Sequence, residues 1–160
     1  QIISLGIASL IILIIMSIVF RSFIGGLLAS LPMSLAVLLI FGLLGNFGIP
    51  LNMTTSLLTC VLVGVGIDYS VHFLWHLREH IRDGDELEQA ISNTMKMSGK
   101  GILFNGISVI VGFSVLMYSV FMPLKAFSVL IMASIGFCLI GGMAILPAMV
   151  SLIDPDFIRK

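Results

Sequence analysis

Long uncharged apolar runs constrain the fold of this chain more than any other feature of its sequence. No Asp, Glu, Lys or Arg stands between Arg21 and Asp68, or between Lys125 and Asp154. Only 10% of the residues are charged and 59% are hydrophobic, whereas a soluble domain has about 25% charged residues. Because the chain has too few polar residues to cover a water-exposed surface, we expect an all-α membrane protein rather than a soluble domain.

Five apolar stretches are long enough to cross a bilayer, which takes roughly 20 helical residues. The first two are joined so tightly at Arg21 that we expect them to form an antiparallel hairpin, and Asn52 or Thr54 is available as the N-cap of the third. Because the sequence begins with Gln1 inside an apolar run, we expect a fragment of a longer protein, with residues 1–160 as a single transmembrane domain. The expected spans are residues 2–20, 23–44, 53–77, 102–121 and 126–153.

Lysine and arginine are divided unevenly between the two sides of this predicted bundle. Of the eight such residues, Lys125 alone falls on one side. Because cytoplasmic loops carry the excess of positive charge, we expect the loop 78–100 and the C-terminus to be cytoplasmic and the N-terminus to lie outside. The sequence thus predicts a multi-pass protein of the inner (plasma) membrane.

Within that loop, the sequence predicts a short cytoplasmic amphipathic helix over residues 85–99. Asp85 and Glu88 have the spacing of a capping box, and Gly99 is a candidate C-cap. Apolar residues between them recur at helical spacing. We interpret the segment as a connector that lies along the cytoplasmic face of the bundle.

Composition and motifs argue against several other classes of protein. The formal net charge is zero, so no basic field would attract nucleic acid. Cys60 and Cys138 lie in apolar stretches without a second ligand at metal-binding spacing. The sequence has neither a glycine-rich phosphate loop nor a Ser-His-Asp arrangement at readable spacing. We therefore expect no enzyme, no cofactor and no metal site.

Asp68 is the one acidic residue inside a predicted span. An ionised carboxylate near the centre of a bilayer costs at least about 2.5–3.5 kcal/mol, and such residues commonly serve as proton or ion relays. His72 lies one turn nearer the cytoplasm on the same helix face, and Tyr69 adds a neighbouring hydroxyl. We therefore predict a proton relay formed by Asp68, Tyr69 and His72. The alternative is a structural carboxylate held by a polar partner on a neighbouring helix.

Other residues around this carboxylate have supporting roles in the prediction. Gly64 and Gly66 lack side chains and would let another helix approach Asp68. Asn105 and Ser108 in the next span are polar groups that could face the carboxylate, with helix–helix hydrogen bonding as the alternative for both. Residues near the end of the third span are interpreted as interfacial: Trp75, His76 and His80.

Several motifs together resemble one known family. The pattern G-x-x-x-D-Y at residues 64–69 resembles the fourth helix of a membrane half in the resistance–nodulation–division (RND) superfamily. The branch is the MMPL type, which includes the mycobacterial membrane protein large exporters, hopanoid transporters and Patched-like proteins. Lys100–Asn105, Phe121–Leu124 and Leu146–Ala148 resemble later parts of the same half, and the pair Phe104-Asn105 resembles its C-terminal version.

This resemblance implies a fold, partners and a function. The five spans would be helices two to six of one RND-type half, with Asp68 and Tyr69 at the proton-relay positions. The partners would be membrane lipid, a hydrophobic substrate, and the other transmembrane half and extracytoplasmic domains of the same protein. The function would be that of the transmembrane part of a proton-driven exporter of lipids or other hydrophobic molecules.

Two alternative functions share this helical architecture. One is a sterol-sensing-type lipid-binding regulatory domain, and the other is a SecD/SecF-like translocation accessory. The titratable Asp68 beside Tyr69 favours proton coupling over sensing alone. The run Asp68–Phe73 resembles the exporter branch more than the translocation branch.

Overall fold

Helices make up the regular secondary structure of the part of the chain that the computed structural model describes, which is residues 2–46, 48 and 52–153. Four helical stretches, 23–46, 55–82, 87–118 and 122–153, are long and apolar enough to cross a membrane, and a shorter apolar helix precedes them. The expected all-α membrane fold is therefore confirmed. The elements are α1 (Ile2–Val19), α2 (Phe23–Asn46), α3 (Met53–Arg82), α4 (Leu87–Ser114), η1 (Val115–Tyr118), α5 (Met122–Ile140), η2 (Gly141–Ile145) and α6 (Leu146–Ile153).

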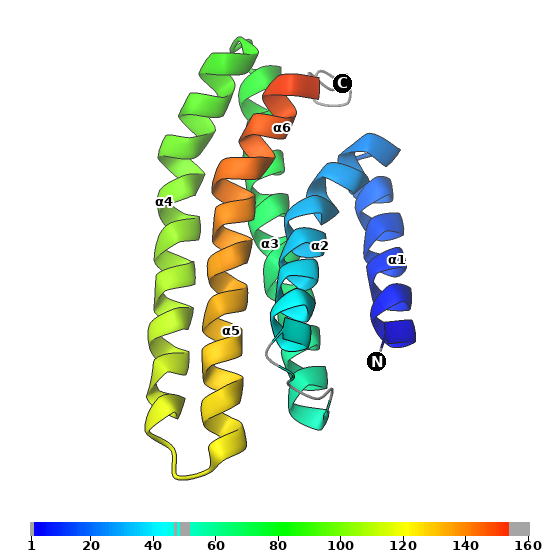
Figure 1. Cartoon of the computed structure of the whole chain (residues 1–160). Coiled ribbons are helices and arrows are strands. Elements are labelled where there is room, and N and C mark those ends of the chain that lie inside the picture. The colour runs from blue at the N-terminus through cyan, green and yellow to red at the C-terminus, as the bar shows by residue number, and fades with distance from the viewer. Residues whose placement is uncertain (1, 47, 49–51, 154–160) are drawn as a thin grey trace.

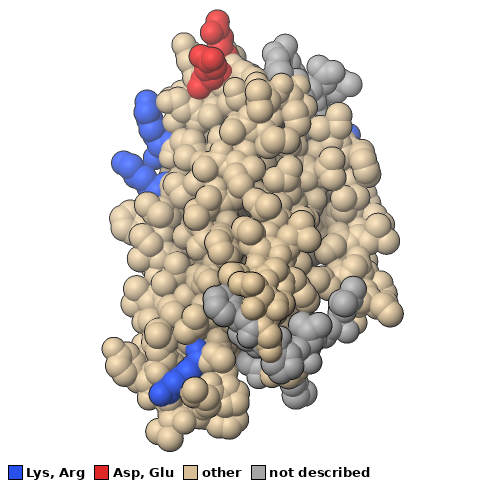
Figure 2. Space-filling view, in the orientation of Figure 1, with Lys and Arg blue, Asp and Glu red and all other residues tan. Residues whose placement is uncertain are grey.

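The long helices run alternately up and down the bundle (Figure 1). α2, α3 and α5 contact one another, α4 packs against α3 and α5, and α1 packs chiefly against α2 at the edge of the bundle. α1 begins at one end of the bundle and α6 ends at the other (Figure 1). On the face shown in Figure 2, charged side chains lie toward the two ends with a broad uncharged band between them, as expected of an integral membrane protein.

The link between α1 and α2 is a tight turn that satisfies the last carbonyl groups of α1. The Ser22 N–H donates to Ser17 O at 3.0 Å, and the Arg21 N–H donates to Ile18 O at 3.1 Å, which is the pattern of a Schellman motif. Arg21 has a φ of 50°, in the left-handed region where glycine is usual. A residue with a side chain loses about 1–2 kcal/mol there. The expected hairpin is present, with an unfavourable residue at its tightest point.

Small residues bring α2, α3 and α5 close together. A Cβ atom added at Gly66 of α3 would lie 3.0 Å from Sγ of Cys138 and 3.3 Å from Cα of Met33. A Cβ atom added at Gly141 would lie 2.9 Å from Cβ of Pro32. The core between these helices is apolar and almost completely buried; it includes Met33, Ala36, Ile40, Leu62, Phe73, Ile131, Ile135 and Cys138.

A wide helical turn, η2, joins α5 to α6. It is π-helical over Gly141–Ile145, and Pro147 follows two residues later. Proline has no N–H to donate and its ring crowds the preceding turn, so helices commonly bend where a proline and a π-helical turn occur together. α6 accordingly leans away from the axis of α5 (Figure 1).

The ends of α3 and α4 confirm one expected cap and correct another. Asn52 caps α3, where its side chain accepts a hydrogen bond from the Thr55 N–H at 3.1 Å. The capping box expected at Asp85 is absent, because the N-cap of α4 is Glu86 and no side chain caps this end. The Asp85 carboxylate instead accepts a hydrogen bond from Asn93 at 3.1 Å and lies 3.4 Å from Nδ1 of His80.

The residues expected to form a short helix over 85–99 belong to a longer element. Residues 87–99 form the first turns of α4, which continues without a break to Ser114, and residues 85 and 86 precede the helix. Gly99 does not end a helix, because it is buried within α4, where an added Cβ would lie 3.6 Å from Cε of Met143. Gly99 is therefore an interior residue of α4 and not its C-cap.

A Gly66→Val substitution tests the close approach of the three central helices. The valine side chain would overlap Met33 and Cys138, so we expect a loss of about 1–3 kcal/mol of stability, as is usual for an overpacked core. Gly136→Val is the matched control, because nothing lies within 4 Å of a Cβ atom added at Gly136. Thermal unfolding of the full-length protein in detergent would measure both; equal losses would contradict the packing described.

Chemical labelling tests the expected orientation. Lys96, Lys100 and Lys125 are exposed on the chain, and Lys125 lies in the first turns of α5, at the end of the bundle opposite the link between α3 and α4 (Figure 1). We expect a membrane-impermeant amine reagent to modify Lys125 in intact cells, and Lys96 and Lys100 only after permeabilisation. Mass spectrometry of the peptides reads the result, and the reverse pattern would invert the topology.

Candidate functional site

α3 and α4 together line a cavity of about 290 Å³ near the middle of α3. The three residues predicted as a proton relay line it, together with Asn105 of the neighbouring helix. Ionisable or hydrogen-bonding side chains thus come from both helices. The lining residues are Asp68, Tyr69, His72 and His76 of α3, and Ser98, Gly101, Ile102 and Asn105 of α4.

The periodicity of α3 gives neighbouring residues different surroundings. Asp68 and His72 are one turn apart and both exposed on the surface of the chain, whereas Tyr69 is only 1% exposed. In the part of the chain that the structure describes, no hydrogen bond or ion pair involves the Asp68 carboxylate. The carboxylate is therefore available to a proton, to water or to a group outside this chain.

Tyr69 is packed in the core and is also one of the residues that line the cavity. A Cβ atom added at Gly142, in the wide turn η2, would lie 3.3 Å from Cβ of Tyr69, so the glycine lets the two helices approach at this point. The Tyr69 hydroxyl is buried and has no hydrogen-bond partner among the described residues. Leaving such a group unpaired costs about 1–3 kcal/mol, so an unpaired hydroxyl on a residue that lines a polar cavity indicates a functional role.

α4 contributes a second unpaired hydroxyl. Oγ of Ser98 is buried without a hydrogen-bond partner among the described residues, and the exposed Asn105 lies two turns further along α4. Gly101 between them leaves open space, because nothing lies within 4 Å of a Cβ atom added there. Polar groups on both helices therefore surround a space large enough for water.

His76 is a lining residue that the sequence reasoning treated as merely interfacial. It lies one turn beyond His72, and its Nδ1 atom is 3.3 Å from Oε2 of Glu79. The cavity and this contact together place Asp68, His72, His76 and Glu79 in succession along α3. The spacing of four residues between Asp68, His72 and His76 was the signal in the sequence that could have identified this row.

Not every predicted residue lies at the cavity. Ser108 is exposed beyond it, and its Oγ donates to the Phe104 carbonyl at 2.7 Å. Gly64 faces open space, which leaves room for another helix, whereas Gly66 is turned toward Met33 in the core. The two glycines differ because residues two apart on a helix point in different directions. Among the described residues, no group of three His, Cys, Asp or Glu side chains could hold a metal ion.

Comparison with known proteins identifies a matching family and several relatives. Residues 1–156 match the MMPL family. A putative membrane protein of Methanocaldococcus jannaschii is 29% identical over 139 residues, which cover 87% of this chain and 36% of that protein. The probable transport protein MmpL12 of Mycobacterium tuberculosis is 26% identical over 88% of this chain and 13% of its own length.

A third relative carries a more specific name. The trehalose monomycolate exporter MmpL3 of Mycolicibacterium smegmatis is 26% identical over 79% of this chain and 13% of its own length. No solved structure matches the chain significantly. The chain spans well under half the length of each of these relatives.

Proposed function

Because the chain belongs to the MMPL family, we propose that it is the transmembrane part of a proton-driven exporter of lipids or other hydrophobic molecules. In this proposal, Asp68 takes up and releases the proton that drives export. The observation that carries the proposal is an unpaired intramembrane carboxylate at a polar cavity shared with Tyr69 and His72. Relatives named as transport protein and exporter support the same function.

Proton transfer needs a path as well as a titratable group. A cavity of about 290 Å³ has room for several water molecules, each of which takes about 30 Å³ in the liquid. His72 and His76 follow Asp68 at steps of roughly 6 Å along the helix, and His76 contacts Glu79. Water and these two imidazoles would carry the proton between Asp68 and the cytoplasmic end of α3.

Tyr69 would stabilise the ionised form of Asp68. Its hydroxyl is a donor without a partner among the described residues, and its ring is fixed by packing in the core. A hydrogen bond from a fixed donor to a carboxylate is stronger than one between neutral groups. The two side chains are not hydrogen-bonded to each other in this structure. The bond would therefore form when Asp68 ionises and break when Asp68 takes up a proton, which would change the contacts between α3 and its surroundings.

The exposed polar face of α3 and α4 supports a partner in the membrane. Asp68, His72 and Asn105 are all exposed on this chain, and charged or polar groups facing lipid are costly. We therefore propose that this face packs against the other transmembrane half of the same protein. In this proposal, the full-length protein also has extracytoplasmic domains. Gly64, with open space beside it, would let a helix of that half approach.

An Asp68→Asn substitution tests the relay. Asparagine keeps the size of the side chain but does not ionise, so we expect gradient-driven export to fall at least about a hundredfold, as for other essential proton-transfer groups. The assay would use the full-length protein in vesicles, with a fluorescent lipid analogue as the exported probe and a trapped dye for proton flux.

Two further variants control that experiment. Ser108→Ala removes a hydroxyl from the same region of α4 without touching the cavity and should export normally. Tyr69→Phe should reduce export less than Asp68→Asn, because it removes a stabilising donor but leaves the carboxylate. Gradient-dependent export by a folded Asp68→Asn protein would refute the relay, whatever the other two variants do.

A further inference from the structure

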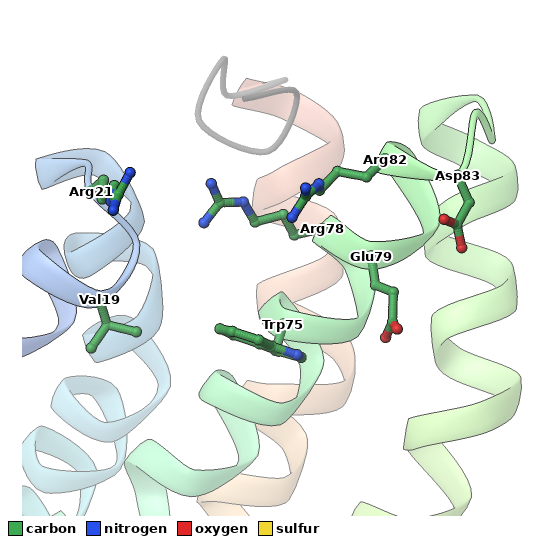
Figure 3. A pocket seen from close by; sticks show the side chains of 7 residues that line it. All are labelled: Val19, Arg21, Trp75, Arg78, Glu79, Arg82 and Asp83. Carbon is green, nitrogen blue, oxygen red and sulfur yellow. The ribbon is translucent and has the colours of Figure 1, made fainter.

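A second cavity, of about 680 Å³, lies where the α1–α2 turn faces the end of α3 (Figure 3). Three arginines line it: Arg21 from the turn, and Arg78 and Arg82 from successive turns of α3. Trp75 and Val19 form its apolar part. These residues are brought together only by the fold, because more than fifty positions separate Arg21 from the other two arginines.

The arginines are not neutralised by carboxylates within the described part of the chain, where no ion pair involves any of the three. Nε of Arg78 is a buried atom without a hydrogen-bond partner there. Glu79 and Asp83 also line the cavity, but Figure 3 shows their carboxylates directed away from the guanidinium groups. Glu79 is moreover in contact with His76 at 3.3 Å.

Arg21 occupies a backbone position that disfavours it. Its φ of 50° lies in the left-handed region, at the point of the Schellman motif where glycine is usual. Glycine would make the turn without strain, and asparagine with less strain than arginine, so the arginine points to a role for its side chain. Strain of this kind commonly marks a functional site. The turn places Arg21 among the residues that line the cavity.

The apolar part of the cavity indicates which kind of anion fits. Val19 is 43% exposed, and Ile15, one turn earlier on the same face of α1, is 48% exposed, so the surface that continues from the arginines along α1 is apolar. Trp75 is a residue type enriched at the membrane–water boundary. A free phosphate ion would leave these apolar side chains uncovered, whereas the glycerol and acyl chains of a lipid would cover them.

We propose that this cavity binds the headgroup of an anionic phospholipid. The phosphodiester would accept hydrogen bonds from the guanidinium groups of Arg78 and Arg82, with Arg21 closing the site from the other side. Guanidinium groups form paired hydrogen bonds with phosphate oxygens in a fixed planar geometry. The acyl chains would lie along the exposed apolar face of α1. This site is separate from the Asp68 cavity and does not depend on a proton relay.

Lipid titration of the full-length protein in detergent, followed by native mass spectrometry, tests the proposal. The probe is phosphatidylglycerol, with zwitterionic phosphatidylcholine for comparison. We expect the double substitution Arg78→Gln and Arg82→Gln to weaken phosphatidylglycerol binding at least about tenfold. The matched control, Lys96→Gln with Lys100→Gln, removes two cations of α4 that do not line the cavity and should change binding less than about twofold.

Arg21→Asn separates binding from folding. Asparagine tolerates the left-handed conformation better than arginine, so the variant should unfold at the same or a higher temperature while binding phosphatidylglycerol more weakly. Unchanged binding in the double arginine variant, or equal weakening in the lysine control, would overturn the proposal. Displacement of phosphatidylglycerol by inorganic phosphate at equal concentration would overturn the lipid as the source of the phosphate group.

Discussion

The cost of placing polar groups in hydrocarbon determines this structure. Backbone amides must be paired within each span, so the chain folds into helices, and charged side chains lie toward the two ends of the bundle. Small residues such as Gly66 and Gly141 then let the helices approach closely, because packing rather than burial from water drives their association. Asp68, near the middle of α3, departs from this pattern, which is why its surroundings carry the proposed function.

The sequence was sufficient to predict what depends on hydropathy and short-range turns. The long apolar runs predicted the helices, and the tight link at Arg21 predicted the hairpin. The continuity of α4 was not predictable in the same way, because a glycine such as Gly99 is typical of a helix C-cap. In the structure, Gly99 lies inside α4 and faces Met143. The cap at Asp85 failed because its carboxylate has partners on both flanking helices, at His80 and Asn93.

The part of the site that lies on α3 was predictable from the sequence. Asp68 and Tyr69 are neighbours in α3 and His72 lies one turn further on, so their proximity could be read from spacing. Asn105 was predicted as a polar group of the next span. The position of Ser98 and the different surroundings of Gly64 and Gly66 required the packing of α3 on its neighbours. The arginine cavity is formed by the α1–α2 turn and the end of α3. These segments are far apart in the sequence, so the hydropathy pattern could not predict that they lie side by side.

The unbroken course of α4 has a mechanical consequence. This helix runs from the link with α3, through Ser98 and Asn105 at the Asp68 cavity, to the opposite end of the bundle. At 1.5 Å per residue it is a rod of about 42 Å, and a tilt of about 5° would move one end by roughly 4 Å relative to the other. A tilt about its middle, at the level of the Asp68 cavity, would move the two ends of α4 in opposite directions without any hinge in the helix itself.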